Sequence, residues 1–435
     1  CGKQQGLPRL LAEGRTDKET AAQKGVSPST VRNHRFKHRE KERQERECLS
    51  LKGKDLRMEV VSYEECGEKF SFANYKAADI LVFHAPDGTP DMRELALVAD
   101  YFARHPGTVV LYADEDEIGA DGERKNPWLK PDWSPDTLIS YFYFGGFFAV
   151  RREEGSHVQW LGERDVRRNL YDFALKAVEI TGSADHIDSV LFHRSNIEPW
   201  GQEESYEDLK RAAYERRGWP VRPEGKVSVI IPSKDNPRVL SDCIHSVMEA
   251  STWKDFEIIV VDNGSSAENR KRIERMRDML QPQYRFSYHY EPMEFNFSRM
   301  CNIGVSMASG DYVLLLNDDI EITQEDWLEK MMEKAVLPHV GAVGAKLIYP
   351  GTEIIQHAGI TNIHLGPAHK LQFRSDANEY YFLKNRLAFD VLGVTGACLL
   401  VKRSVYEEAG GFNEKLRVAF NDVEFCYHLH DLGYV

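Results

Sequence analysis

The sequence predicts an α/β fold built on an open, largely parallel sheet. Short apolar runs alternate with helix-period segments along most of the chain, and runs such as Val313–Leu316 are continuously apolar, which is typical of strands buried on both faces. Polar residues cluster where these runs end, most densely at Asn317, Asp318 and Asp319. Open α/β sheets bind ligands at the carboxyl ends of their strands, so these ends form the candidate site.

Length and charge predict several domains with different partners. The chain has 435 residues, 42% of them apolar, and a net charge of -13. Its first 57 residues nevertheless carry 15 Lys and Arg against 8 Asp and Glu, which leaves the remainder strongly acidic. We expect four segments: a basic head over 1–57, an α/β module over 58–198, a linker with one helix over 199–225, and a C-terminal domain over 226–435.

Cysteine usage and hydropathy predict the compartment. The seven cysteines are scattered and form no Cys-x-x-Cys pair, as expected for a reduced cytoplasmic protein. No apolar run approaches the roughly 18 residues that span a bilayer. We therefore expect a cytoplasmic location, either free or as a peripheral protein at the inner face of the membrane. The chain opens on Cys1 and stops at Val435 without terminal punctuation, and we expect a fragment of a longer product.

The basic head has a helix, a glycine turn at Gly25 and a second helix capped by Ser27 and Pro28. This arrangement resembles the helix-turn-helix of bacterial response-regulator and sigma-factor type DNA-binding domains. The resemblance implies that Arg32, Asn33 and Arg35 lie nearest the DNA. The alternative is a solvated helical hairpin, because mixed charges follow over 37–47.

The segment 58–198 looks like a degenerate copy of the C-terminal domain. Asp79-Ile-Leu-Val-Phe parallels Asp311-Tyr-Val-Leu-Leu, and Ala149-Val-Arg-Arg parallels Leu400-Val-Lys-Arg. Counting forward from Asp79 places Ala85-Pro86-Asp87 opposite Asn317-Asp318-Asp319, so one carboxylate of the pair is missing. We expect this module to be non-catalytic.

An acidic triplet in the same module, Asp114-Glu115-Asp116, admits two interpretations. It follows an expected strand over 109–112, so a metal site is one of them. A solvated acidic turn is the favoured one.

In the C-terminal domain, expected strands over 227–231 and 256–261 end in Pro-Ser-Lys-Asp (232–235) and Asp-Asn-Gly-Ser (262–265), and a helix follows each. Strand, polar loop, helix and strand make half of a nucleotide-binding sheet. No Gly-x-Gly-x-x-Gly and no P-loop pattern is present. These features favour a nucleotide whose phosphates are held by a metal ion.

Five motifs of the C-terminal domain occur in the order that is typical of a known enzyme family. They are Val-Ser-Val-Ile-Ile-Pro-Ser-Lys-Asp (227–235), Glu-Ile-Ile-Val-Val-Asp-Asn-Gly-Ser (257–265), Gly-Asp-Tyr-Val-Leu-Leu-Leu-Asn-Asp-Asp (310–319), Gly-Gly-Phe-Asn-Glu (410–414) and Asn-Asp-Val-Glu-Phe-Cys (421–426). The set resembles family 2 glycosyltransferases of GT-A fold, nearest the bacterial rhamnosyltransferase-like branch. The resemblance is strong over 226–435 and weak over about 70–200.

The resemblance implies a role for each matching residue. The nucleotide pocket would be lined by Pro232, Ser233, Asp235, Asp262 and Asp318. Asp319, the last residue of the DxD-type motif, would bind a Mg²⁺ or Mn²⁺ ion that bridges the diphosphate of a UDP- or dTDP-linked sugar. Gly396 would let donor and acceptor sugars approach the backbone.

Asp422 aligns with the catalytic base of inverting family members, whose usual Glu-Asp pair is Asn421-Asp422 here. A base of this kind takes the proton of an acceptor hydroxyl and contributes on the order of 10²–10⁴-fold. An N-cap role for Asp422 is the competing interpretation. His357 and His369 are equally consistent with a place near the donor and with structural histidines.

The sequence as a whole predicts a metal-dependent inverting glycosyltransferase that extends a cell-surface polysaccharide on a glycan or lipid-linked acceptor. The alternative is a non-catalytic protein of the same fold that binds a sugar nucleotide or DNA. A sugar nucleotidylyltransferase is disfavoured because the first loop, Pro-Ser-Lys-Asp-Asn-Pro, lacks the Gly-rich, basic character of that class.

Overall fold

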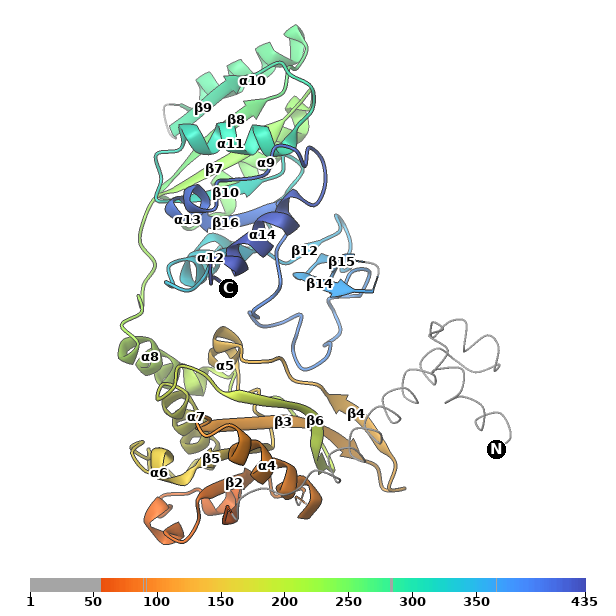
Figure 1. Cartoon of the computed structure of the whole chain (residues 1–435). Helices are drawn as coiled ribbons and strands as arrows, with labels where there is room; N and C mark the ends of the chain where they lie inside the picture. The colour runs from red at the N-terminus through yellow and green to blue at the C-terminus, as the bar shows by residue number, and fades with distance from the viewer. Residues whose placement is uncertain (1–55, 89, 91, 282–284, 365) are drawn as a thin grey trace, which may run out of the picture. The chain divides into compact units, whose positions relative to one another are not determined.

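A computed structural model describes residues 56–88, 90, 92–281, 285–364 and 366–435 (Figure 1). The chain divides into two compact units, 1–206 and 207–435, and each is treated separately below. The predicted DNA-contacting residues Arg32, Asn33 and Arg35 lie outside the described residues. Among the described residues, no helix is long and apolar enough to cross a membrane.

The C-terminal unit is built on a six-stranded sheet with the order β11-β16-β10-β7-β8-β9. The strands β10, β7, β8 and β9 run parallel, and β16 is antiparallel to both of its neighbours. Their bounds are β7 Val227–Ser233, β8 Phe256–Asp262, β9 Arg285–Tyr290, β10 Tyr312–Leu316, β11 Ala342–Gly344 and β16 Cys398–Lys402. Four parallel strands thus bring their carboxyl ends to one edge.

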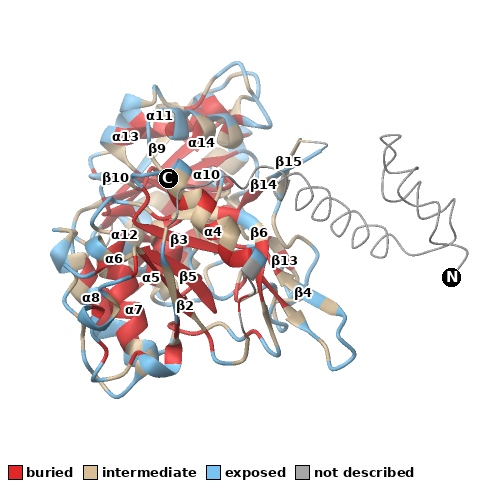
Figure 2. Cartoon of the chain, turned by 60° about the horizontal axis from the view of Figure 1, so that its bottom comes forward, coloured by how far each residue is buried: buried red, intermediate tan, exposed pale blue. Residues whose placement is uncertain are grey.

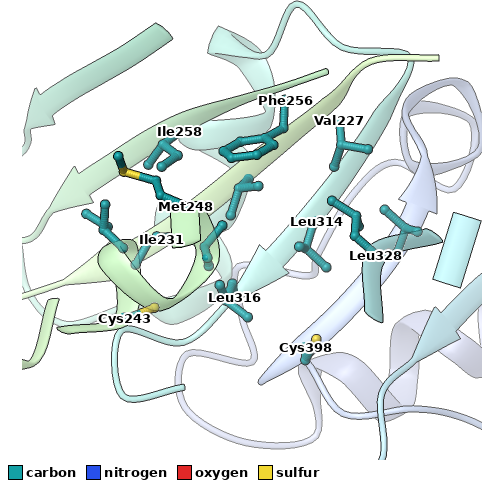
Figure 3. Packing of buried hydrophobic residues seen from close by; sticks show 14 of the residues in the cluster. Val227, Ile231, Cys243, Met248, Phe256, Ile258, Leu314, Leu316, Leu328 and Cys398 are labelled. Carbon is teal, nitrogen blue, oxygen red and sulfur yellow. The ribbon is translucent and has the colours of Figure 1, made fainter. Parts of the chain in front are cut away.

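Helices cover both faces of this sheet because its strands are apolar on both sides. One cluster joins Val229, Ile258 and Leu314 to helices α9 (Pro237–Ala250), α10 (Ala267–Leu280) and α12 (Trp327–Ala335), as Figure 3 shows for part of it. The alternate strand residues, such as Ile230 and Leu315, pack on α11 (Phe297–Met307), α13 (Arg403–Glu408) and α14 (Asn421–Asp431). The strands β7, β8 and β10 are buried throughout, and Figure 2 shows where buried residues lie in the fold.

Hydrogen bonds around one carboxylate fasten the amino ends of the strands. Glu257 accepts from the Ser228 hydroxyl at 2.6 Å and from the Ser309 N–H at 2.7 Å, and it pairs with Lys226 at 2.8 Å. Burial alone would raise the pKa of Glu257, but these contacts overcome it and lower the pKa to about 2. This end of the sheet is therefore closed by internal contacts, and the carboxyl ends are left for ligands.

Two small antiparallel ribbons follow β11 in the chain. They are β12 (Leu347–Ile348) with β13 (Ile355–His357), and β14 (Ile360–Ile363) with β15 (Gly366–His369). Ile360 N–H donates to the Gly393 carbonyl at 2.7 Å, and the Tyr427 hydroxyl of α14 donates to Asn362 at 2.6 Å. The ribbons are thus fixed beside α14 and the segment that precedes β16.

The N-terminal unit has a six-stranded sheet in which β1, β2, β5, β3 and β4 are successive neighbours and β6 also pairs with β3. The strands are β1 Met58–Ser62, β2 Ile80–His84, β3 Val110–Ile118, β4 Arg124–Trp128, β5 Phe147–Arg151 and β6 Asp185–Arg194. The helices are α4 Met92–Arg104, α5 Pro135–Ser140, α6 Arg152–Gly155 and α7 Val166–Ala177, with 3₁₀ turns at η1 Tyr63–Glu65, η2 Phe72–Tyr75 and η3 Glu204–Tyr206. Helix α8, Glu207–Arg216, begins the C-terminal unit and matches the helix expected in the linker.

A repeated set of contacts begins with Asp79, just before β2. Its Oδ2 accepts the Arg57 N–H at 2.9 Å, and its carbonyl oxygen accepts the N–H of Arg152, which follows β5, at 3.0 Å. The Arg152 side chain then donates through Nε to the Ala78 carbonyl at 2.8 Å. Strand β2 is parallel to β1 and antiparallel to β5.

The same contacts recur around Asp311, just before β10. Its Oδ2 accepts the Lys226 N–H at 3.1 Å, its carbonyl accepts the Arg403 N–H at 2.8 Å, and Arg403 Nε donates to the Gly310 carbonyl at 2.9 Å. The order β3-β5-β2-β1 therefore corresponds to β11-β16-β10-β7. This correspondence is consistent with the predicted duplication, which stays a prediction, and the described N-terminal unit has no counterpart of β8 and β9.

The favoured interpretation of Asp114-Glu115-Asp116 as a solvated acidic turn is wrong. All three lie inside β3, which runs to Ile118, and they are at most 3% exposed. Asp114 accepts from the Lys130 N–H at 2.8 Å, and Glu115 accepts from the Gly146 N–H at 3.0 Å. Extension of the strand, driven by its pairing with β4 and β6, buries carboxylates that local sequence places in a loop.

Candidate active site

The carboxyl end of β10 presents the predicted carboxylate pair. Asp318 is half-buried and Asp319 is exposed. Burial raises the pKa of Asp318, the Ser233 hydrogen bond lowers it, and the adjacent Asp319 charge raises it again. Within the described part of the chain, no ion pair reaches either carboxylate. The negative charge here is not neutralised by the protein itself.

Hydrogen bonds link three strand ends at this edge. The Ser233 hydroxyl, at the end of β7, donates to Asp318 Oδ2 at 2.6 Å, and the Asn263 N–H, just past β8, donates to the Ser233 carbonyl at 3.0 Å. Pro232 is buried inside β7. The structure therefore brings together Ser233, Asp318 and the loop after β8, as the motif order predicts.

Asp262 ends β8 and is completely buried. Its Oδ1 accepts the Ser265 N–H at 2.8 Å, and its Oδ2 accepts the hydroxyl of Tyr288 on β9. Burial, and then this hydrogen bond, raise the pKa of Tyr288. Sequence reasoning missed Tyr288 because it identified no strand over 285–290, although the polar–apolar alternation there was a usable signal.

Asp235 holds the loops after β7 and β8 together. It adopts a left-handed φ of 55°, its N–H donates to the Ser265 hydroxyl at 2.8 Å, and its Oδ1 accepts the Ser266 N–H at 2.8 Å. That backbone hydrogen bond, followed by one from the Asn269 side chain at 3.0 Å, lowers the pKa of Asp235. Asp235 is thus bonded like a loop residue and keeps Oδ2 exposed.

The hydrogen bonding of the Asn263 side chain, at the same edge of the sheet, is unusual. This side chain is fully buried, yet neither the amide oxygen nor the amide nitrogen has a hydrogen-bond partner in the part of the chain that the structure describes. Buried polar groups normally have partners, and each exception needs an explanation such as a water molecule or a ligand. The sequence analysis assigned Asn263 no role of its own.

Asp422 and Gly396 meet directly. Asp422 Oδ2 accepts the Gly396 N–H at 2.9 Å, and Oδ1 accepts the Val423 N–H at 2.9 Å. Asp422 lies inside α14 and the N-cap residue is Phe420, so the competing N-cap interpretation does not hold. A Cβ on Gly396 would meet only ordinary contacts, the nearest atom being in Phe297 at 3.5 Å. The protein itself would therefore accept alanine there.

The segment before β16 joins the carboxylate pair to Asp422. The Asn317 N–H donates to the Ala397 carbonyl at 3.0 Å, one residue after Gly396. Asn421, the neighbour of Asp422, is buried and donates to the Ser298 hydroxyl at 3.1 Å, so its role is structural. Asp318, Asp319, Gly396 and Asp422 thus belong to one connected region.

His357 is buried next to this region, and His369 is exposed. Their Nδ1 atoms are 2.6 Å apart, and His357 Nε2 accepts the Thr395 N–H at 3.3 Å. Burial, and then His369, lower the pKa of His357 to about 3, so the His357 ring is neutral.

The equivalent region of the N-terminal unit is neutralised internally. Asp87 stands where Asp319 stands in the other copy, because Ala85 donates to the Gly146 carbonyl at 2.8 Å as Asn317 does to Ala397. Arg194 Nε binds both oxygens of Asp87, at 2.9 and 3.2 Å. A guanidinium group therefore occupies the cationic position in this copy.

The residues at the end of β10 suit a hard divalent cation. No group of three or more metal-ligating side chains exists among the described residues, so Asp318 and Asp319 would supply at most part of a coordination shell. Mg²⁺ is characteristically held by one or two carboxylates together with substrate phosphates. Two adjacent carboxylates without an internal cation fit that pattern.

Comparison with known proteins concerns the domain that carries these residues. An open α/β sheet with polar side chains at the carboxyl ends of its parallel strands is typical of domains that bind ligands at that edge. Residues 228–410 match the family Glycosyl transferase family 2. The chain therefore carries a family 2 glycosyltransferase domain, and the predicted GT-A fold and enzyme class are confirmed for it.

Two relatives span most of the chain. It is 32% identical over 384 residues to the O-antigen biosynthesis protein RfbC of Myxococcus xanthus, covering 82% of the chain and 30% of that protein. It is 31% identical over 424 residues to the uncharacterized protein y4gI of Sinorhizobium fredii, covering 87% of the chain and 45% of that protein. The chain thus spans less than half the length of either relative.

Among solved structures, the chain is similar to the mannosyltransferase PcManGT of Pyrobaculum calidifontis in complex with GDP-Man and Mn²⁺. The identity is 17%, the TM-score is 0.38, and the match covers 52% of this chain and 59% of that one.

Proposed function

We propose that the C-terminal unit transfers a sugar from a nucleoside-diphosphate donor to a glycan or lipid-linked acceptor, with inversion at the anomeric carbon, during surface polysaccharide synthesis. The observation that carries this proposal is the connection between Asp318-Asp319 and Asp422 through Asn317, Ala397 and Gly396. The relative named for O-antigen biosynthesis and one named as a glucosyltransferase acting on an undecaprenol-linked glycan support the acceptor class.

The donor side rests on the edge formed by β7, β8 and β10. Ser233, Asp235, Asp262 and the buried amide of Asn263 surround the space where a nucleoside would bind, and Pro232 shapes the first loop. Asp319, with Asp318, would hold Mg²⁺ or Mn²⁺. When bound, the ion would stabilise the negative charge that develops on the leaving nucleoside diphosphate.

Asp422 would take the proton of the acceptor hydroxyl. Each of its oxygens accepts a single backbone N–H, from Gly396 and Val423, which fixes the carboxylate while leaving a lone pair on each oxygen for the acceptor. The rhamnosyltransferase-like branch, a UDP- or dTDP-linked donor and a location at the inner face of the membrane are further parts of this proposal.

The test is nucleoside-diphosphate release from a panel of UDP-, dTDP- and GDP-hexoses with Mn²⁺. We expect EDTA and Asp319→Ala to abolish release, and Asp422→Asn to lower it by about 10²–10⁴-fold while calorimetry still detects UDP or dTDP. Glu424→Gln, which removes an exposed carboxylate from the same helix, should leave release unchanged. Equal turnover with EDTA and in both site variants would refute the proposal. Nucleotide binding by the wild type without turnover would favour the non-catalytic alternative.

A further inference from the structure

Successive peptide N–H groups before β16 are each held by a different partner. Val394 donates to Cys426 Sγ at 3.4 Å, Thr395 to His357 Nε2 at 3.3 Å, and Gly396 to Asp422 Oδ2 at 2.9 Å. Cys426 and Asp422 belong to α14, whereas His357 comes from β13. Beside the hydrogen bond from Ile360 to the Gly393 carbonyl, the His357 contact therefore ties this segment to the ribbons outside the main core.

The hydrogen-bond pattern fixes the tautomer of His357. Because Nε2 accepts a backbone N–H, it cannot carry a proton, and the neutral ring must carry its proton on Nδ1. That proton points to His369 Nδ1, 2.6 Å away, which must accept it. The two rings lie nearly perpendicular, at 82°. His369 thus selects the form of His357 that receives Thr395.

We propose that His357, set by His369, is a positioning residue for Asp422: by accepting the Thr395 N–H it fixes the backbone that presents the Gly396 N–H to the Asp422 carboxylate. The inference rests on the proposed function, in which Asp422 is the base. Without the His357 contact, the backbone torsions of Thr395 are released and the Gly396 N–H loses its fixed direction. The carboxylate then samples orientations away from the acceptor hydroxyl.

The effect of substitutions distinguishes a buried histidine that only fills space from one that positions a base. His357→Leu keeps an apolar side chain of similar size and removes the acceptor, whereas His357→Gln retains an acceptor at the position of Nε2. We expect His357→Leu to lower kcat for donor hydrolysis by about 10²-fold with little change in the donor KM. His357→Gln should recover most of that loss, and His369→Ala should give an intermediate loss.

Two readouts do not depend on turnover. Nitrogen-15 shifts of labelled histidine should show His357 protonated at Nδ1 and bare at Nε2. Hydrogen exchange of the peptide spanning 393–398 should quicken about fivefold to tenfold in His357→Leu and stay near wild type in His357→Gln. A protonated Nε2, or exchange unchanged by His357→Leu, would overturn the inference.

Measuring nucleoside-diphosphate release then distinguishes the positioning role of His357 from the proposed transferase function. If the wild type releases nucleoside diphosphate and His357→Leu matches its kcat, the positioning role is wrong while the function stands. If the wild type releases none from any donor, the proposed function fails, and the exchange result alone decides whether His357 holds the Asp422 segment.

Discussion

The aspartates of this chain have different roles, and the local sequence around each one only partly indicates its role. Asp79 and Asp311 fasten the beginnings of equivalent strands through backbone N–H groups. Asp318 and Asp319 end a strand with no cationic partner among the described residues, whereas Asp87 is bound by Arg194. What distinguishes a structural aspartate from a site aspartate here is whether the protein already satisfies its charge.

Asn263 gives the clearest prediction for a single residue. Its buried amide has no partner among the described residues, so replacing it by leucine, which has the same branched arrangement of heavy side-chain atoms but is larger, removes an unsatisfied polar group. We expect Asn263→Leu to leave the free energy of unfolding unchanged or to raise it by about 1 kcal/mol. Calorimetry with UDP and dTDP should show at least tenfold weaker binding, because the amide would be kept for the nucleotide.

Asn385 is the matched control for this change. It is also buried, at 3% exposed, but its amide donates to Asn378 and Asp376 and accepts from the Tyr380 N–H. Asn385→Leu should therefore lower the free energy of unfolding by about 1–3 kcal/mol. A comparable loss in Asn263→Leu, with nucleotide affinity unchanged, would mean that a structural water satisfies Asn263.

Sequence reasoning located the residues that motifs carry and missed those that only packing defines. Asp318, Asp319, Gly396 and Asp422 were identified by motif order, and the structure brings them into one region. The strand that carries Tyr288 left a signal in the sequence that was missed, whereas the hydrogen bonds of Tyr288 with Asp262 and of Thr395 with His357 depend on packing between segments far apart in the chain.

At the scale of elements, the residues that stabilise the parallel sheet and those expected to bind ligands lie at opposite ends of its strands. Its amino ends are closed by the contacts of Glu257 with Lys226, Ser228 and Ser309, and its carboxyl ends carry the candidate site. Because the two ends use different residues, changes at Glu257 should alter unfolding without altering the geometry of Asp318 and Asp422.

Glu257→Gln should make unfolding of the C-terminal unit less dependent on pH. The pKa of Glu257 falls from an ordinary 4.5 to about 2 in the folded state, so its contribution is complete above pH 4.5 and is lost as the pH falls towards 2. We expect the variant to lose roughly 2–3 kcal/mol at pH 7. The difference from wild type should shrink between about pH 5 and pH 2.

Urea unfolding followed by hydrogen exchange of peptides from β7 and β8 measures this unit specifically. Glu268→Gln, which removes an exposed carboxylate paired with Arg272, should change the free energy of unfolding by no more than about 0.5 kcal/mol. A wild-type advantage that persists undiminished at pH 2 would show that the Glu257 charge is not its source.

The strands were predictable where their apolar runs are continuous. The expected strands over 227–231, 256–261 and 313–316 correspond to β7, β8 and β10, each extended by one or two residues. β3 was underestimated because its second half is acidic, and only pairing with β4 and β6 keeps Asp114, Glu115 and Asp116 in a strand. At such positions strand pairing outweighs the low β-propensity of the individual residues.

At the scale of the whole molecule, two related units have diverged in charge. The strand order and the Asp–Arg contacts are kept in both, which indicates that they maintain the fold. Only the C-terminal unit keeps the extra strands β8 and β9 and an uncompensated carboxylate pair. In the N-terminal unit, Arg194 binds the corresponding aspartate, Asp87.

This divergence predicts that the full chain has a single Mn²⁺ site. Asp319→Asn and Asp87→Asn change equivalent residues of the two units and remove one charge each. We expect Asp319→Asn to weaken Mn²⁺ binding at least tenfold in the presence of UDP, because it removes a carboxylate that no protein cation satisfies. Asp87→Asn should leave Mn²⁺ affinity and stoichiometry unchanged, while destabilising the N-terminal unit, because Arg194, with 12% of its side chain exposed, loses the charge of its partner carboxylate. Electron paramagnetic resonance of free Mn²⁺ during titration measures both quantities. A stoichiometry of two, or equal losses in the two variants, would show that the N-terminal unit binds the ion as well, and that Arg194 yields to it.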